Sequence, residues 1–208
     1  MPLPQLALER MDGRPISPQD LAQVSQTLDL WTGVVTSAFT LDGQTVNVSV
    51  AAHPKEDVLA VRIESPLLRG KLGVSVTLPR GHDKKTKNNP PLDWGEPESH
   101  TTSIASQTDR ALDLVHTRDS VYFARFTSVV PIRIERTGAH AFRLSTANQG
   151  ELEFTAAFGP TNPSSVPTAE QVRAGSRAYW PKFWSSGAAI DFTGSKDPRA
   201  RELERHQA

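Results

Sequence analysis

Apolar and polar side chains alternate along most of the chain between residues 28 and 158. A period of two is typical of strands that bury one face and expose the other, as in antiparallel sheets stacked on each other. No long helical pattern separates the alternating stretches, so parallel βαβ units are not expected. The chain is therefore predicted to be mainly β, an antiparallel β-sandwich with a C-terminal helical linker segment. The alternating apolar positions are Val46/Val48/Val50, Leu59/Val61/Ile63, Leu72/Val74/Val76/Leu78, Leu112/Leu114, Val121/Phe123, Ile132/Ile134, Phe142/Leu144 and Leu152/Phe154.

A tight hairpin is predicted at Asp42-Gly43. Residues 34–40 have the composition of a strand, and residues 46–50 form the alternating return strand. Asp-Gly is the strongest short signal for a two-residue hairpin, because a type I′ turn needs positive φ angles. The two strands are expected to pair directly across this turn.

The first 27 residues are interpreted as an N-terminal extension ahead of a sandwich domain over residues 28–160. Ser17 can cap a short helix, with Pro18 at its first position. In this helix Leu21 and Val24 are expected to face inward.

A linker and two helices are predicted over residues 161–208, after a stretch rich in Gly, Pro and Ser. Thr168 and Gln171 form a capping box that begins the first helix. Pro181 removes a backbone donor and is expected to kink or break it. Asp197 caps the last helix, which is too short and polar to be stable alone.

Aromatic side chains concentrate on the first of these helices and just after it. Trp180, Trp184 and Phe192 could form a sugar platform, but aromatic side chains four residues apart on a helix more often serve packing. We therefore expect them to anchor the sandwich to another domain. The residues concerned are Tyr179, Trp180, Phe183, Trp184 and Phe192.

Composition excludes several classes of function. Lys+Arg and Asp+Glu are equal at 23 each in 208 residues, and this zero net charge argues against a nucleic-acid partner. Without cysteine there are no disulfides, thiolate nucleophiles or cysteine zinc sites. No stretch approaches the ~18 apolar residues of a membrane helix, so no membrane partner is expected. Residues 1–10 lack the features of a signal peptide, and no cofactor is predicted.

The segment over residues 80–99 breaks the alternation and carries most of the candidate chemistry. Long loops without periodicity are often functional. An aromatic ring can cover the apolar face of a sugar while neighbouring carboxylates accept bonds from its hydroxyls, and glycosidases also use paired carboxylates. A structural tryptophan packed under the loop is the alternative. The candidate carbohydrate-binding residues are His82, Asp83, Asp93, Trp94 and His100.

Imidazoles and carboxylates of this kind could also ligate a metal. Their spacing matches no compact ligand motif, and a solvated loop explains them as well, so no metal is predicted. His53 and His116 are interpreted as hydrogen-bonded structural residues. Ser185-Ser186-Gly187 is not a nucleophile elbow, and no catalytic residue is assigned.

Several stretches resemble the N-terminal β-sandwich of six-hairpin glycosidases, a group that includes enzymes of the glycoside hydrolase family 65 and 95 type. They are residues 26–37, His53-Pro54 and residues 59–66. Asp93-Trp94, residues 97–102 and residues 183–192 resemble a bacterial and fungal branch of the same group. The resemblance covers most of the chain, roughly from residue 26 to residue 205.

The resemblance implies a largely structural sandwich that packs on an (α/α)6 barrel and lends loops to the rim of its substrate cleft. In such enzymes the catalytic acids lie in the barrel, so none is carried over onto this chain. The family usually has strands ahead of Leu6 and continues after Arg205, and the chain therefore looks truncated at both ends. Full-length members are secreted or periplasmic, and the localisation of this chain is left open.

The leading hypothesis is the structural and substrate-rim domain of a glycoside hydrolase, inactive by itself, with carbohydrate and the barrel domain of the same protein as partners. An apolar docking surface left uncovered would also favour self-association. One alternative is a stand-alone carbohydrate-binding sandwich with aromatic residues on a concave face. The other is a small hydrolase that uses the loop carboxylates Asp83, Asp93 and Glu96.

Overall fold

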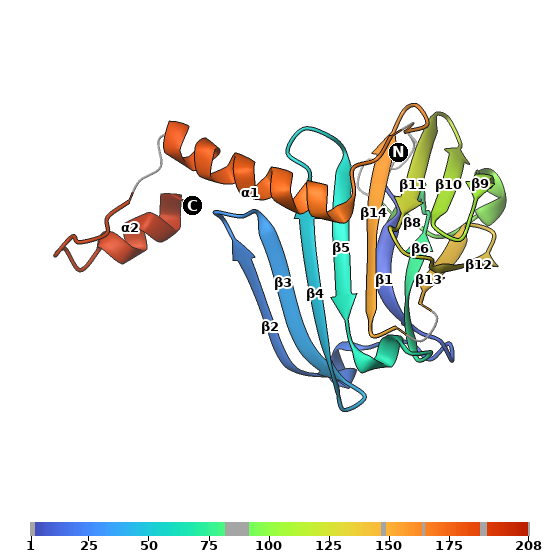
Figure 1. The fold of residues 1–208 in the computed structure, drawn as a ribbon, viewed down its shortest axis with the longest axis horizontal. Helices are drawn as coiled ribbons and strands as arrows, with labels where there is room; N and C mark the ends of the chain where they lie inside the picture. Colours follow the sequence, from blue (N-terminus) through green and yellow to red (C-terminus); the bar gives the residue numbers. More distant parts are fainter. Residues whose placement is uncertain (1–2, 82–91, 147–148, 164, 188–190, 208) are drawn as a thin grey trace.

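Two antiparallel sheets stacked as a sandwich form the body of the protein (Figure 1). The computed structural model describes residues 3–81, 92–146, 149–163, 165–187 and 191–207. The larger sheet contains, in spatial order, β2 (Leu21–Asp29), β3 (Val34–Leu41), β4 (Gln44–Ala52), β5 (Val58–Glu64), β14 (Glu151–Gly159), β11 (Val121–Thr127), β10 (Ala111–Thr117) and β9 (Thr101–Gln107). The smaller sheet contains β1 (Gln5–Arg10), β6 (Leu72–Thr77), β13 (Ala141–Ser145) and β12 (Arg133–Gly138). The predicted mainly β class is confirmed.

The core lies between the two sheets and is built from the alternating positions. Phe126 and Phe154 of the larger sheet and Phe142 of the smaller one are among its largest fully buried side chains. Truncating such a phenylalanine to alanine typically costs about 3–5 kcal/mol. In β11 the buried face carries Tyr122 and Phe126, whereas Val121 is 45% exposed. This strand therefore buries the face opposite to the one predicted from Val121 and Phe123.

The predicted hairpin at Asp42-Gly43 is confirmed. Asp42 has φ 49° and Gly43 has φ 73°, both positive as a type I′ turn requires. The strands β3 and β4 pair directly on either side of the turn, from Leu41 with Gln44 outward.

The helix predicted after Ser17 is reduced to a single 3-10 turn, Pro18–Asp20. The Asp20 carboxylate accepts the backbone N–H of Ser17 at 2.8 Å and its hydroxyl at 3.1 Å, but the Ser17 side chain does not accept the capping hydrogen bond that was expected. Leu21 then begins β2, which pairs with β3, and Val24 is 62% exposed instead of facing inward. The pairing with β3 supplies backbone partners that a short polar helix could not match.

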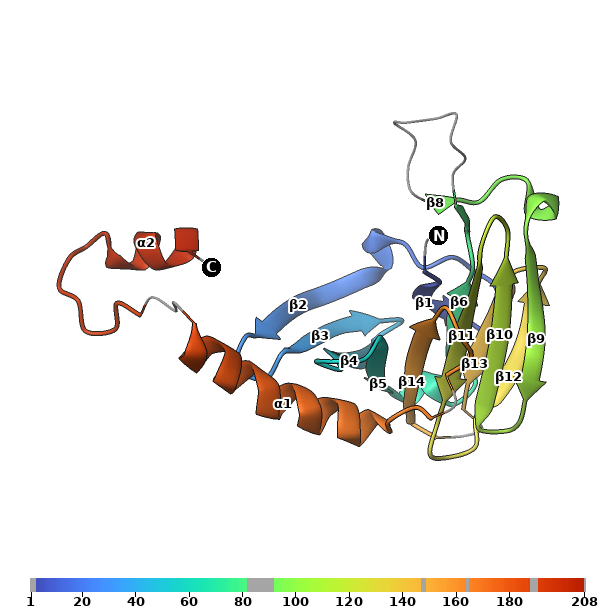
Figure 2. The same cartoon turned by 90° about the horizontal axis from the view of Figure 1, so that it is seen from above.

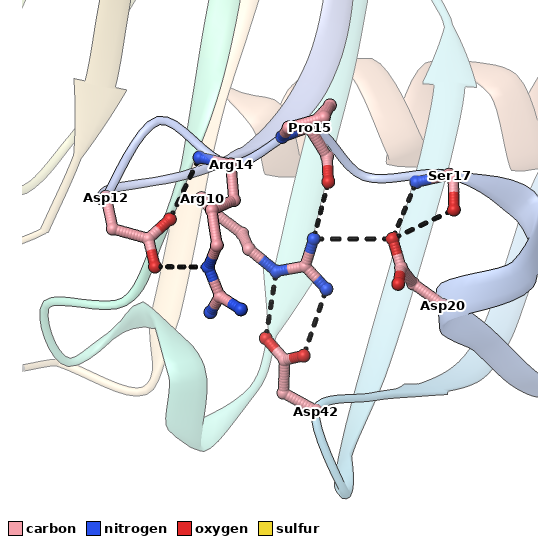
Figure 3. Close-up of polar contacts among 7 residues, drawn as sticks. All are labelled: Arg10, Asp12, Arg14, Pro15, Ser17, Asp20 and Asp42. Carbon is pink, nitrogen blue, oxygen red and sulfur yellow. Dashed lines mark hydrogen bonds and ion pairs between the residues drawn. The ribbon is translucent and has the colours of Figure 1, made fainter.

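Arg10 joins the end of β1 to two other parts of the chain (Figure 3). Its guanidinium donates to both carboxylate oxygens of Asp42, at 3.0 and 2.9 Å. It also donates to the carbonyl oxygen of Pro15 at 2.6 Å and lies 3.4 Å from the carboxylate of Asp20. This buried guanidinium therefore fixes the polar segment between β1 and β2 against the β3–β4 turn.

Helix α1 (Ala169–Ser186) crosses the outer face of the larger sheet (Figure 2). Small side chains on β4, β5 and β14 let it approach closely, and Val172 packs into the cluster they form. The predicted capping box is confirmed: Gln171 Oε1 accepts the N–H of Thr168 at 2.8 Å, and Thr168 Oγ1 accepts the N–H of Gln171 at 3.3 Å. The alanines beneath the helix are Ala51, Ala60 and Ala157.

Pro181 was expected to kink or break the helix, and the break is wrong, because α1 continues through it to Ser186. The proline ring removes one backbone hydrogen bond, but the aromatic side chains around it pack on each other and on the sandwich. Beyond α1, helix α2 (Ala200–Gln207) lies away from both sheets (Figures 1 and 2). The Asp197 carboxylate accepts the N–H of Arg199 at 2.9 Å ahead of α2, which agrees with its predicted capping role. Among the described residues, no helix is both long and apolar enough to cross a membrane.

Candidate functional site

The C-terminal half of α1 carries four aromatic side chains in two rows. Tyr179 and Phe183 stack with ring centroids 6.1 Å apart, and so do Trp180 and Trp184. The rows touch edge to face, with 5.4 Å between the ring centroids of Trp180 and Phe183. Such aromatic pairs contribute about 0.5–1.5 kcal/mol beyond the area that they bury. The four rings therefore support one another as a unit.

The tryptophan row packs on the turn between β2 and β3. The indole N–H of Trp184 donates to the carbonyl oxygen of Leu30 at 2.7 Å. The hydroxyl of the buried Ser176 donates to the carbonyl oxygen of Thr32 at 2.8 Å. Two hydrogen bonds from separate turns of α1 thus hold the helix against this one strand connection.

Gly33 allows this close approach. It has φ 66°, and a Cβ atom added there would lie 2.0 Å from Nε1 of Trp180. The preceding turn is held by Asp29, which accepts the N–H of Trp31 at 2.9 Å and the hydroxyl of Thr32 at 2.8 Å. The hydrogen bonds from Thr32 and Trp31 hold the pKa of the Asp29 carboxyl below its usual range.

The second row and the turn leave an exposed apolar surface. Tyr179 is 36% exposed, Phe183 46%, Leu30 45% and Trp31 58%. We call these four residues the aromatic surface. Its backbone is fixed by the hydrogen bonds to α1, so it is preorganised, and exposed apolar patches on structured elements mark interaction sites. Four of the five predicted packing residues thus share one helix face. The fifth, Phe192, is half-buried, and its N–H donates to the Glu204 carboxylate at 2.5 Å.

The loop candidates are only partly described. His82 and Asp83 lie outside the described residues, and Asp93 is described by its backbone, which pairs with Arg80 in the two-stranded β7 (Arg80–Gly81) and β8 (Leu92–Asp93). Trp94 is 53% exposed, as a sugar-contacting ring would need to be. Glu96 forms an ion pair with Arg80, which fixes the base of the loop.

His100 differs from the exposed Trp94, because it is buried in a cluster of imidazoles. Its ring stacks on that of His140 at 3.7 Å and meets the ring of His116 edge-on at 5.0 Å. His116 is fully buried, and Tyr122 lies 5.0 Å from it. His116 was expected to be a hydrogen-bonded structural residue, and it is hydrogen-bonded.

The hydrogen bonds of the cluster fix its neutral tautomers. A carbonyl oxygen only accepts, so Pro97, 2.9 Å from Nε2 of His140, keeps the proton of that neutral ring on Nε2. Nδ1 of His140 therefore accepts from the Thr102 hydroxyl at 2.8 Å. The same hydroxyl oxygen accepts from Nδ1–H of His116 at 2.9 Å. The lone pair of His116 is left on Nε2, 3.4 Å from Nδ1 of His100.

Burial is the main reason that His116 stays neutral. Together with the nearby His100 and His140, it lowers the pKa of His116 to about 4. The sequence carries little sign of this cluster, because the three histidines come from separate segments. Strand register joins two of them: Thr102 lies opposite His116 in the β9–β10 pair, two residues after His100.

Comparison with known proteins adds little to this geometry. No family model matches the chain, and no curated protein matches it. Among solved structures, one match is described as "Putative kojibiose phosphorylase from human microbiome", with 11% sequence identity and a TM-score of 0.47. The match covers 91% of this chain and 25% of that one, so this chain spans about a quarter of that protein's length. The similarity gives no residue of this chain a role.

Proposed function

We propose that the chain is a structural β-sandwich domain that docks through its aromatic surface onto a helical domain of the same polypeptide, in a protein that acts on carbohydrate. On this proposal the sandwich supports the helical domain, and the chemistry is carried out by residues outside this chain. The observation that carries the proposal is the preorganised exposure of Leu30, Trp31, Tyr179 and Phe183.

Docking is favoured by the type and rigidity of these side chains. Tryptophan and tyrosine dominate the binding energy of protein interfaces, and a surface already fixed in the free protein loses little entropy on binding. The aromatic surface has both properties, since hydrogen bonds from Trp184 and Ser176 hold its turn against α1.

A helical occupant is favoured by the course of the chain. α1 leads from the aromatic surface toward α2, which lies away from both sheets and has Leu203 47% exposed. A helix as short as α2 is marginal without a partner. A helical domain could cover Leu203 and the aromatic surface together, as the sequence resemblance to six-hairpin glycosidases implies.

The isolated 208-residue chain offers a direct test. Its uncovered surface is expected to cause concentration-dependent self-association in sedimentation velocity experiments. The double variant Trp31→Ser/Phe183→Ser should remain monomeric, whereas Val129→Ser, which changes a 64% exposed valine outside the surface, should behave like the wild type. A wild-type chain that stays monomeric and binds no hydrophobic dye would contradict an adhesive surface.

Carbohydrate contact is a second element of the proposal, and Trp94 supports it. This ring is 53% exposed on a loop whose base is fixed by the Arg80–Glu96 ion pair. If the loop contacts sugar, the chain should bind members of a glycan array, and Trp94→Ala should abolish the signal while Trp31→Ala leaves it unchanged. An array without hits, or binding that survives Trp94→Ala, would remove Trp94 from the proposal.

A further inference from the structure

We propose that His100, His116 and His140 form a binding site for a divalent transition-metal ion, with Zn²⁺ as the best fit. The three rings offer one ligand nitrogen each, and these nitrogens lie within 4.8 Å of one another. The proposal is independent of the docking function, because it uses none of the residues of the aromatic surface.

The nitrogens of His100 and His116 already have the spacing of a metal site. Zinc binds imidazole nitrogen at about 2.0–2.1 Å with tetrahedral geometry, which places two ligand nitrogens about 3.4 Å apart. Nδ1 of His100 and Nε2 of His116 are 3.4 Å apart. A neutral imidazole frees its second nitrogen by moving its proton, so this pair needs a change of tautomer at His100 and little movement.

The third ligand requires a local rearrangement. His140 stacks on His100 with an interplanar angle of 16°, and parallel stacked rings do not point their lone pairs at one ion. His140 lies in the turn between β12 and β13 and is only half-buried, so its ring has room to turn toward the other two. The ligand nitrogens must then close from a maximum of 4.8 Å to the tetrahedral spacing.

Two of the three rings, His116 and His140, each donate a hydrogen bond to an oxygen through the ring nitrogen that would not bind the metal. A ligating histidine usually donates its other ring N–H to an oxygen, which fixes the tautomer and the direction of the lone pair. The Thr102 hydroxyl oxygen accepts Nδ1–H of His116 at 2.9 Å, and the Pro97 carbonyl accepts Nε2–H of His140 at 2.9 Å. His116 therefore already has its second nitrogen held as a metal ligand requires, whereas Nδ1 of His140 must exchange the Thr102 hydroxyl for the ion.

The ligand chemistry selects the class of ion. Imidazoles suit zinc, nickel and copper, whereas magnesium and calcium prefer carboxylate and carbonyl oxygens. The guanidinium of Arg136 donates to the backbone oxygen of Thr102 at 3.1 Å, so one positive charge near the site opposes a bound cation.

The test is calorimetric titration of the chelator-treated chain with ZnCl2, with MgCl2 as the control ion. We expect one Zn²⁺ per chain, bound with a dissociation constant in the micromolar range or tighter, and no heat from Mg²⁺. His140→Ala, at a half-buried turn position, should weaken zinc binding at least tenfold. His53→Asn keeps an acceptor for the backbone N–H groups of Lys55 and Glu56 and should leave the affinity unchanged.

Coordination geometry supplies a second readout. Co²⁺ added in place of Zn²⁺ should give the intense visible absorption of a tetrahedral complex, and this band should be lost in His140→Ala. The proposal is overturned if the wild-type chain binds no zinc, if His140→Ala binds it as tightly as the wild type, or if His53→Asn weakens binding to the same degree. None of these outcomes bears on docking, which is measured by self-association.

Discussion

At the scale of single residues, Arg10 determines how the N-terminal segment is held. Arg10 is 5% exposed, and its guanidinium makes a paired hydrogen bond to Asp42, with Pro15 and Asp20 completing its contacts (Figure 3). A buried guanidinium is costly unless its donors are satisfied. Loss of Asp42 would leave two of these donors without their acceptor, so the carboxylate is as important to the fold as the arginine.

This contact predicts a specific loss of stability in acid. The hydrogen bonds from Arg10 lower the pKa of Asp42 in the folded protein, so its carboxyl binds a proton less readily there than in the unfolded chain. The ionised Asp42 carboxylate therefore contributes fully to the stability of the folded protein above the pKa of the unfolded chain, about 4. This contribution is lost as the pH falls through the lower pKa of the folded protein. At pH 7, Asp42→Asn should be less stable than the wild type. When the pH falls below 4, the variant should lose less stability than the wild type loses.

Urea unfolding at a series of pH values measures both effects. Glu56→Gln, which changes an exposed carboxylate elsewhere on the surface, is the matched control and should follow the wild type. An Asp42→Asn variant with wild-type stability at pH 7 would show that the Arg10 contact contributes nothing.

At the scale of elements, the contact between α1 and the β2–β3 turn depends on the absence of a side chain at Gly33. A Cβ atom there would meet both Trp180 and the hydroxyl of Ser176, at 2.0 and 2.6 Å. Gly43 has a similar positive φ, but nothing lies within 4 Å of its Cβ position. The two glycines thus share a backbone requirement and differ only in how closely a neighbouring element approaches.

The pair of variants Gly33→Ala and Gly43→Ala separates these two effects. Gly43→Ala should cost about 1–2 kcal/mol, the cost of a left-handed conformation for a residue with a Cβ atom. Gly33→Ala should cost that amount and roughly 1–3 kcal/mol more, because the added methyl group displaces Trp180. Denaturant unfolding gives both costs, and tryptophan fluorescence should change only in Gly33→Ala. Equal costs would mean that α1 does not pack on the turn as described.

The sequence predicts elements well where burial dictates the side-chain pattern. The alternation of Val46, Val48 and Val50, the turn at Asp42-Gly43 and the capping box at Thr168 all have direct counterparts in the structure. The strands β2 and β9 escape prediction because they are the edge strands of the larger sheet and expose most residues on both faces. Without a buried face they have no apolar alternation to detect.

The histidine cluster escapes prediction for a different reason. His100 comes from just before β9, His116 from β10 and His140 from the turn after β12, so strand pairing and sheet stacking bring them together. Their spacing along the chain matches no ligand motif. By contrast, the i, i+4 spacing of Tyr179 and Phe183 is local to one helix, and this is why the shared face could be predicted.

At the scale of the whole molecule, the two sheets form a body around one hydrophobic core, and α1 extends from it toward α2 (Figures 1 and 2). The aromatic surface is formed by the end of α1 that leads to α2 and by the β2–β3 turn beside it. The metal-site candidate lies on β9, β10 and the β12–β13 turn, at the other edge of the larger sheet. The two proposals therefore concern separate parts of the molecule and can fail separately.

The central claim, that a helical domain of the same polypeptide covers the aromatic surface, is tested most directly by hydroxyl-radical footprinting. The protein expressed from its complete coding frame is compared with the isolated 208-residue chain. Trp31, Tyr179 and Phe183 are predicted to be strongly protected in the complete product, while the exposed Val129 reacts equally in both. Equal modification of the three aromatic residues in both samples, or a coding frame that ends at Ala208, would contradict the claim.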